Sequence, residues 1–324
     1  MEKRGLYYGC LTLAMMIVGS SVVAGKVMAE RLPIFLASGI RFGIAAAVLL
    51  IWLQIKEGGF PRIERKEWCW LTLQSFAGVF LFSICLLVGV RFTTAMEAGI
   101  LTATTPALVA VLSVWLLKEK WERSLGAGLL LAIGGVAILK FHAGFSDTQV
   151  TFSWLGNFLV MMAVAGEALF TVVGKILSPR LSPLAISTAV AGIGFLCFFP
   201  FAIVQAWTFD FSSLTGLDLF LLLYHALIVT VLAFFLWYTG VSRVRGSVSG
   251  LFTAVMPLTA VLLSVMVLGE ALTHSHLIGM ALVLAGIAAG TWRSGEGSSV
   301  EREKEDQDRG CPEKTADERG RQPC

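Results

Sequence analysis

Charged side chains are scarce in this sequence. Asp, Glu, Lys and Arg make up 15% of the 324 residues, whereas about a quarter is typical of soluble globular domains. Hydrophobic residues make up 56% of the chain, and its mean hydropathy is +0.79. This scarcity of charge excludes a soluble domain for most of the chain and predicts an integral membrane protein.

The usual signatures of catalysis, metal binding and nucleic-acid binding are also missing. The six cysteines show no disulfide framework and no zinc or redox spacing, so we expect no metal site and no cofactor. HExxH, phosphate-loop and GxSxG motifs are absent, which argues against an enzyme. No basic helix or aromatic-interleaved basic patch indicates a nucleic-acid partner.

Much of the charge that is present lies at the C-terminal end. Residues 294–324 hold nine acidic and six basic side chains among few large apolar ones. Such a segment cannot bury enough apolar surface to fold alone, so we expect a disordered cytoplasmic tail.

Ten apolar segments precede this tail, each bounded by charged or turn residues. Each predicts a helix, because an open strand in lipid would leave backbone groups unpaired. The expected fold is therefore an all-α integral membrane protein with ten transmembrane helices. They lie at about 5–26, 32–54, 68–90, 94–117, 125–141, 154–177, 183–206, 215–240, 247–268 and 276–292.

Lysine and arginine in the loops predict the orientation of these helices. With a cytoplasmic N-terminus, the cytoplasmic segments before the tail hold fourteen of these residues and the outer segments hold four. Positively charged loops stay on the cytoplasmic side. We therefore expect a multi-pass protein of the cell membrane with both termini in the cytoplasm.

The sequence repeats itself at an offset of 151 residues. The stretch GILTATTP (99–106) aligns with GLFTAVMP (250–257), and 15 of the 47 positions from 89 to 135 are identical to their counterparts. In the first and sixth spans the offset is 149, where VVAGKVM (22–28) meets TVVGKIL (171–177). A match that includes glycines, a proline and a glutamate exceeds what shared composition produces, so we infer a duplicated five-helix unit.

The two five-helix repeats occupy residues 1–143 and 144–293. Because five is odd, the second repeat enters the membrane upside down relative to the first. Inverted halves are a common plan of secondary transporters, in which the substrate binds at mid-membrane between the halves and rocking alternates access. The chain has no ATPase module, so a gradient would drive uphill transport.

Four stretches also carry a likeness to a known family. They read GSSVVAGKVM, SGIRFGIAAAVLL, AGILTATTPALVAVLSVWLL and SGLFTAVMPLTAVLLSVMVLGEALTHSHLIGMALVLAGIAAG. The chain resembles the EamA-type transporters of the drug/metabolite transporter superfamily. This resemblance implies ten helices in two inverted repeats, a central cavity, and export or exchange of small metabolites. The first half departs from the family pattern in LLKEKW, where Lys118 replaces the usual glycine.

Helix-breaking residues in the fourth and ninth spans are candidates for gating and substrate binding. Each proline removes a backbone hydrogen bond and frees the carbonyl four residues earlier, which belongs to a threonine. Breaks at matching places in both halves indicate the substrate site of such transporters. The alternative is that they serve helix packing. The six residues are Gly99, Thr102, Pro106, Gly250, Thr253 and Pro257.

Two charged residues lie near the middle of spans, where a charge is costly unless it is paired or hydrated. Glu167 is a candidate for binding a proton, a cation or a substrate amine, and Arg41, beside Phe42, for substrate binding. The alternative is that both are structural and form an ion pair with each other. His225 in the eighth span and Gln74 in the third either line a cavity or contact neighbouring helices.

Three further expectations concern packing. Glu119 and Glu270 come just before the fifth and tenth spans, where a carboxylate stabilises the N-terminus of the next helix. Trp237 and Tyr238 end the eighth span and are expected in the interfacial aromatic belt. The GIAAG motif at 286–290 is typical of close helix contacts and allows a homodimer.

Three functions stay open from the sequence. The favoured one is a secondary transporter of an amino-acid-like or amphipathic solute, with protons as one candidate coupling ion. A membrane-embedded enzyme or sensor on the same scaffold and a small-solute channel are the alternatives. The expected partners are a small-molecule substrate, protons and the lipid bilayer.

Overall fold

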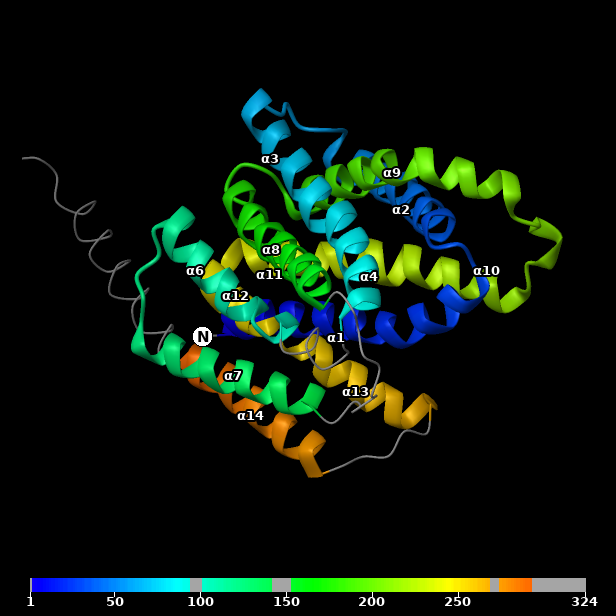
Figure 1. Ribbon diagram of the computed structural model, residues 1–324. Helices are drawn as coiled ribbons and strands as arrows, with labels where there is room; N and C mark the ends of the chain where they lie inside the picture. The colour runs from blue at the N-terminus through cyan, green and yellow to red at the C-terminus, as the bar shows by residue number, and fades with distance from the viewer. Residues whose placement is uncertain (1, 94–100, 142–152, 269–273, 293–324) are drawn as a thin grey trace, which may run out of the picture.

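The structure, a computed structural model, describes residues 2–93, 101–141, 153–268 and 274–292 (Figure 1). Every regular element within these residues is helical, which confirms the all-α prediction. The α-helices are α1 (Glu2–Arg31), α2 (Ile34–Glu57), α3 (Arg65–Ser75), α4 (Phe82–Phe92), α6 (Thr105–Leu117), α7 (Arg123–Phe141), α8 (Ser153–Leu177), α9 (Pro183–Thr208), α10 (Gly216–Leu223), α11 (Ala233–Arg243), α12 (Gly246–Phe252), α13 (Val255–Leu268) and α14 (His274–Trp292). Two π-helical segments, η1 (Phe76–Leu81) and η3 (Tyr224–Leu232), and a 3-10 turn, η2 (Phe211–Ser213), join them.

Seven helical stretches among the described residues are long and apolar enough to cross a membrane. They are Gly5–Val22, Ile34–Glu57, Arg65–Gly89, Trp154–Leu177, Pro183–Thr208, Gly216–Arg243 and Gly246–Leu263. Three shorter apolar helices, Thr105–Leu117, Arg123–Ile138 and Leu277–Thr291, lie where the fourth, fifth and tenth spans are expected. The protein is therefore a multi-pass helical membrane protein, and the count of ten spans stays a prediction.

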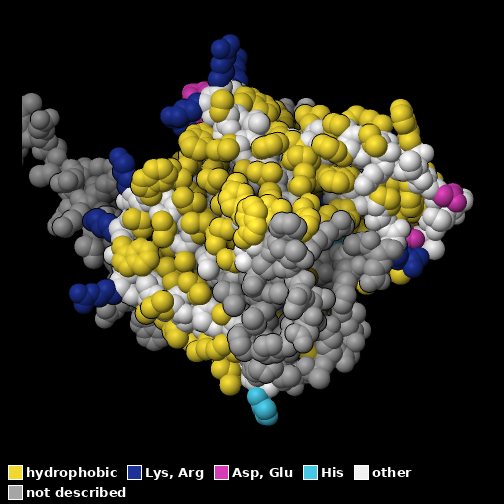
Figure 2. All heavy atoms as spheres, viewed as in Figure 1, with side chains coloured by type: hydrophobic (Ala, Val, Ile, Leu, Met, Phe, Trp, Pro, Cys, Tyr) yellow, Lys and Arg dark blue, Asp and Glu magenta, His cyan; other side chains and the backbone are white. Residues whose placement is uncertain are grey.

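The outside of the bundle is apolar along the helices and charged toward the ends. Figure 2 shows hydrophobic side chains over the middle of one face and Lys and Arg gathered at its left and upper-left margin. Trp115 and Trp207 expose 74% and 85% of their surface. Soluble monomers rarely expose continuous apolar surface of this extent, so this surface fits contact with lipid.

The helices α7 and α14 lie side by side with their backbones in contact (Figure 1). A Cβ atom at Gly128 would lie 2.6 Å from the carbonyl oxygen of Gly286, and one at Gly135 would lie 2.6 Å from that of Gly279. The start of each helix thus meets the end of the other, so the two run antiparallel. Gly128 aligns with Gly279 and Gly135 with Gly286 in the repeat, which makes the contact self-complementary, like a two-fold interface.

This contact also accounts for the GIAAG motif. Gly286 packs on Gly128, and a Cβ atom at Gly290 would collide with Leu251. The close helix contact that the motif predicts therefore forms within the chain. The motif lends no support to a homodimer, which stays an untested prediction.

Other contacts between the halves follow the same two-fold pattern. The helix α1 packs against α11 and α13, and its counterpart α8 packs against α4 and α6. The helix α2 packs against its own counterpart, α9. Because α1, α2, α8, α9 and α11 all contribute to the largest core cluster, the two repeats form one interlocked bundle.

Both halves contain a π-helical segment in the equivalent span. The segments end at Leu81 and Leu232, which differ by the repeat offset of 151, and α4 and α11 begin one residue later. In η3, the hydroxyl of Thr230 donates to the carbonyl of His225, five residues earlier, at 2.9 Å. Such turns are rare and frequently occur at functional sites, which draws attention to the third and eighth spans.

The interfacial assignment of Trp237 and Tyr238 is wrong. The two residues expose only 3% and 0% of their surface. Their side of α11 faces neighbouring helices, where Tyr238 lies 3.1 Å from the amide nitrogen of Gln74. The span boundary alone suggested a belt, but α11 continues to Arg243, so both residues lie inside the helix and pack in the core.

The glycine contact between α7 and α14 generates a paired test. We expect Gly135→Ala to lower the free energy of unfolding by about 1–3 kcal/mol, because its Cβ meets backbone that cannot move aside. Gly134→Ala is the matched control, since nothing lies within 4 Å of its Cβ position, and the higher helix propensity of alanine should stabilise it by up to about 1 kcal/mol. Unfolding of the two purified variants in detergent measures both, and equal destabilisation would contradict the described contact.

Candidate functional site

The fourth and ninth spans are interrupted at matching places. In the fourth span, a turn at Thr104 precedes α6, and in the ninth, α12 ends at Phe252 and α13 begins at Val255. Pro106 and Pro257 lie in the first turn of the helix that follows each break, where an N–H group has no intrahelical partner to lose. Each proline therefore starts a new helix instead of kinking a continuous one.

The carbonyl groups freed by the prolines have partners close by. The hydroxyl of Thr105 donates to the carbonyl of Thr102 at 2.9 Å. In the second half, the backbone N–H of Met256 donates to the carbonyl of Thr253 at 3.2 Å, and the hydroxyl of Thr253 donates to the carbonyl of Gly250 at 2.7 Å. The backbone groups freed at the breaks thus have hydrogen-bond partners within the protein. Lipid could not supply such partners, because the hydrocarbon core has no hydrogen-bonding groups. Their role in gating stays a prediction.

The two breaks also lie against each other. A Cβ atom at Gly250 would lie 2.7 Å from Cγ1 of Val109 and 3.3 Å from the carbonyl oxygen of Pro106. The helix α12 of the second half therefore packs on α6 of the first half at the breaks. Gly99, the counterpart of Gly250, lies outside the described residues.

Glu167 of α8 lies beside the break in the fourth span. Its Oε2 lies 3.0 Å from Thr105 Oγ1, whose single hydrogen is also within reach of the Thr102 carbonyl, and Glu167 is half-buried. In the second half, Met256 occupies the place of Thr105, and a Cβ atom at Gly19 would lie 2.5 Å from its carbonyl oxygen. The carboxylate–hydroxyl contact therefore occurs in one half only. Because both halves pack in the same way, packing alone does not require this contact.

Arg41 of α2 does not form the ion pair with Glu167 that was one alternative. The guanidinium carbon instead lies 4.6 Å from the centroid of the Phe42 ring, a cation–π contact worth about 0.5–2 kcal/mol. Its Nε is enclosed and has no hydrogen-bond partner. The Arg41–Glu167 alternative is therefore wrong, and no described carboxylate neutralises Arg41.

Gln74 and His225 are buried polar groups at the starts of the two π-helical segments. Gln74 Nε2 donates to the carbonyl of Phe170 at 2.7 Å, while Gln74 Oε1 has no hydrogen-bond partner. His225 Nδ1 lies 2.9 Å from the carbonyl oxygen of Leu221. Gln74 therefore joins its span to α8, whereas His225 bonds within its own span, and a role of either in substrate binding stays a prediction.

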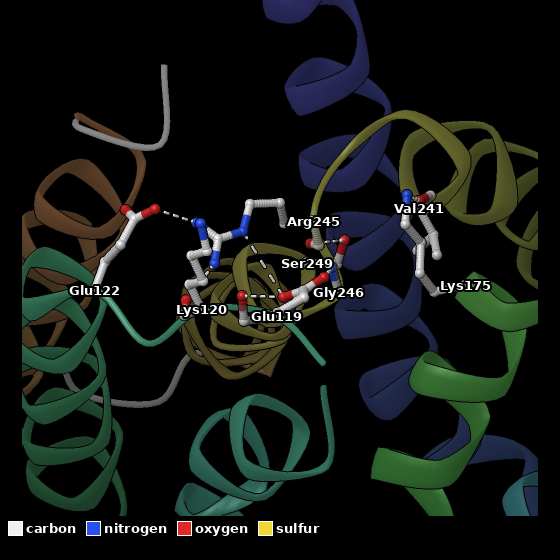
Figure 3. A network of polar contacts seen from close by, with 9 residues as sticks. Glu119, Lys120, Glu122, Lys175, Val241, Arg245, Gly246 and Ser249 are labelled. Atoms are coloured by element: carbon white, nitrogen blue, oxygen red, sulfur yellow. Dashed lines mark hydrogen bonds and ion pairs between the residues drawn. The ribbon is translucent and has the colours of Figure 1, made fainter. Parts of the chain in front are cut away.

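A polar network that the sequence reasoning missed links the two halves at one end of the bundle (Figure 3). Glu119, in the loop between α6 and α7, accepts hydrogen bonds from the backbone N–H groups of Gly246 at 2.7 Å and Ser247 at 3.1 Å, and from Ser247 Oγ at 2.5 Å. It thus caps α12 of the other half and not α7, the next helix. The sequence signal was its match with Glu270, which lies outside the described residues.

Arg245 completes this network. Its guanidinium forms ion pairs with Glu122 and, at 3.8 Å, with Glu119, and it donates to the carbonyl of Lys120 at 2.5 Å (Figure 3). Nearby, Lys175 of α8 donates to two carbonyls at the C-terminal end of α11, at 3.0 and 3.2 Å. These contacts, together with the Glu119 cap, form what we call the Glu119 network.

Lys118, which replaces the glycine usual at this place in the family pattern, directly precedes Glu119 in the chain. Lys118 ends α6 with φ of 55°, in the left-handed conformation, and its N–H donates to the carbonyl of Ser113. A residue other than glycine costs about 1–2 kcal/mol in this conformation. The turn after α6 therefore has the backbone shape that suits glycine, although the sequence supplies lysine.

The described part of the chain contains no group of three or more His, Cys, Asp or Glu side chains that could hold a metal ion. The candidate polar residues instead come singly from different helices. Arg41 comes from α2, Glu167 from α8 and Thr105 from α6. Isolated polar groups of this kind suit binding of a polar solute better than metal coordination.

Comparison with known proteins agrees with this architecture. The family model for EamA-like transporters matches residues 5–141 and again residues 154–290. The uncharacterized transporter YetK of Bacillus subtilis is 52% identical over 286 residues, which cover 88% of this chain and 87% of the relative. The uncharacterized transporter YyaM of the same organism is 27% identical over 76% of this chain and 81% of the relative.

A crystal structure with 18% sequence identity has the same fold. It superposes with a TM-score of 0.73 and covers 89% of this chain and 98% of that protein. Fold, repeat and relatives together define a helical membrane transporter. The chain belongs to the EamA-like transporter family, within the drug/metabolite transporter superfamily, as its motifs predict.

The Glu119 network generates a stability test. We expect Glu119→Ala to lower the free energy of unfolding by about 1–3 kcal/mol, because two backbone donors and a hydroxyl at the start of α12 lose their acceptor. Lys66→Ala is the control, since it truncates an exposed side chain of α3, and such surface substitutions usually change stability by no more than about 0.5 kcal/mol. Denaturant unfolding of both variants in detergent makes the comparison, and a loss no larger than that of the control would contradict the capping role.

Proposed function

We propose that this protein is a secondary active transporter that moves a small, amino-acid-like metabolite across the cell membrane by alternating access. Two inverted five-helix halves, ten spans in all, form the moving parts. Export or exchange is the proposed mode. The single observation that carries the proposal is the pair of matched helix breaks, which contact each other and, in the first half, lie beside the carboxylate of Glu167.

The inverted arrangement is supported by the contact between equivalent helices. The antiparallel, self-complementary packing of α7 and α14 is what a two-fold axis in the membrane plane would produce. The matched pairings of α1 and α8 with the opposite half agree with the same axis. The excess of loop lysine and arginine at one end supports a cytoplasmic location for that end and for both termini.

Two charged side chains suggest the class of solute. Glu167 offers a carboxylate beside the first break, and Arg41 of α2 offers a guanidinium with no ion-pair partner among the described residues. An amino-acid-like solute carries an amine and a carboxylate, which complement these two groups. Thr102, Thr253, Gln74 and His225 are the polar groups proposed to complete the site.

The Glu119 network suggests how access alternates. It joins the loop after α6 in one half to the start of α12 in the other. Opening the cytoplasmic end requires these halves to separate there, so the network must break in each transport cycle. Because backbone N–H groups supply two of its three bonds to Glu119, the closed end reforms without a rearrangement of side chains at α12.

The transport proposal is tested by counterflow. The full chain is purified, reconstituted into liposomes preloaded with unlabelled amino acids, and supplied outside with the labelled compound, one amino acid at a time. We expect saturable uptake that internal substrate accelerates several-fold. A channel would give flux without acceleration, and an enzyme or sensor would give no uptake. The proposal would be contradicted if every amino acid gave either flux without acceleration or no uptake.

The role of Glu167 is tested with the substrate found in this way. We expect Glu167→Gln to raise the KM at least tenfold, because the neutral amide no longer balances the charge of the amine, whereas Glu57→Gln should leave KM unchanged. Glu57 is the matched control because it is an exposed carboxylate at the end of α2. Unchanged KM in Glu167→Gln would assign the carboxylate a structural role.

The inverted arrangement is tested independently of transport. Single cysteines are introduced as Lys120→Cys and Ala271→Cys in a chain freed of its own cysteines, and each is exposed to an impermeant thiol reagent in whole cells. We expect labelling at position 271 only, since the repeat places equivalent loops on opposite sides. Labelling of both positions from the same side would exclude inverted halves.

A further inference from the structure

The repeat places one buried polar side chain at each of two equivalent seams between the halves. Gln74 and His225 are 151 residues apart, which is the repeat offset, and expose 0% and 2% of their surface. Each lies over a glycine of the opposite half. Gln74 Nε2 lies 3.0 Å from the Cβ position of Gly174, and His225 Nε2 lies 3.7 Å from that of Gly25. These glycines are themselves counterparts in VVAGKVM and TVVGKIL.

The backbone positions that face the two side chains also correspond. Gln74 Nε2 donates to the backbone carbonyl of Phe170 in α8, four residues before Gly174. His225 Nε2 faces α1 at Gly25, and Ser21 is the residue four positions before that glycine. Ser21 and Phe170 differ by 149, the offset of these two spans, so each side chain faces the same point of the opposite half.

The two seams differ in the chemistry of the donor. The amide of Gln74 always carries N–H groups, whatever the pH. Nδ1 of the His225 imidazole lies 2.9 Å from the carbonyl oxygen of Leu221, and its Nε2 faces the backbone of α1 beside Gly25. A neutral imidazole has one N–H, so it can donate to one of two carbonyls, whereas the protonated ring donates to both.

We propose that His225 is a proton-binding site whose occupancy controls the seam between α1 and the eighth span, and so couples protons to transport. This inference rests on the proposed transport function. A proton from water binds the lone pair of Nε2 while Nδ1 keeps its hydrogen and its bond to Leu221. The imidazolium then donates to the Ser21 carbonyl and holds the seam closed. Loss of the proton returns the lone pair, and the bond to α1 is lost.

The charged surroundings of His225 suggest how substrate and proton would influence each other. Arg41 belongs to α2, which packs against η3, and a positive charge near an imidazole opposes its protonation. A substrate carboxylate bound at Arg41 would offset that charge, so proton and anion would favour each other's binding. Three other titratable groups on η3 and on the elements packed around it have partners of their own. They are Tyr224, bonded to Ser20, Asp218, paired with Arg31, and Tyr238, bonded to Gln74. The same elements also carry Lys26 on α1, Lys56 and Glu57 on α2, and Arg243 on α11.

The proton site is tested directly by nuclear magnetic resonance. The full chain is labelled with 15N-histidine and placed in lipid nanodiscs, and the ring nitrogens are followed from pH 8 to pH 4. The chain has four histidines, His142, His225, His274 and His276, and the signals missing in His225→Gln identify those of His225. We expect a neutral ring with hydrogen on Nδ1 at high pH and a doubly protonated ring at low pH.

A ring that stays neutral over the whole range would overturn the proposal. If His225→Gln does not fold, replacement of the other three histidines one at a time assigns the same signals. This titration needs no substrate. Its failure therefore leaves the transport proposal standing, and a failure of counterflow with every amino acid leaves the titration interpretable.

Transport by matched variants is the second readout. His225→Gln gives the second half the permanent donor of the first, and Gln74→His gives the first half a titratable donor. With the amino acid found by counterflow, we expect the transport rates of the wild type at pH 5.5 and pH 7.5 to differ at least fivefold. The ratio should fall to near one in His225→Gln and persist in Gln74→His. A wild-type ratio in His225→Gln would exclude His225 as the coupling site.

Discussion

The structure depends on one constraint, which is that backbone N–H and carbonyl groups at membrane depth must find partners inside the protein. The breaks in the fourth and ninth spans satisfy it in two ways. They supply local partners, such as the Thr105 hydroxyl for the Thr102 carbonyl, and they lie against each other, away from lipid. Irregular backbone can then exist in the middle of the bundle, where a solute can reach polar groups.

Because the two halves share one plan, the residues that differ between them point to function. Glycine contacts and π-helical segments recur in both halves, so packing is sufficient to explain them. Glu167 and its contact with Thr105 have no polar counterpart where Met256 stands. His225 replaces an amide by a titratable ring. The groups that break the symmetry are therefore the ones to which we assign solute and proton binding.

The sequence predicted what depends on local composition and on the repeat: the helical class, the family, the breaks at both prolines and the close contact through GIAAG. It did not predict which groups pair across the bundle. Glu119 caps α12 and not α7, because a loop can reach a helix distant in sequence. The equivalence of Gln74 and His225 appears only when the repeat is followed back from residue 89 through the third and eighth spans.

The paired π-helical segments have a mechanical consequence. A π turn holds about one residue more than an α turn, and each residue of an α-helix advances by about 100° around the axis. If one segment tightened to α geometry, the helix beyond it would rotate by roughly that angle without exposing a hydrogen-bonding group to lipid. The third and eighth spans thus each contain a point about which the following helix could rotate. Such a rotation would change which side chains of α4 and α11 face their neighbours.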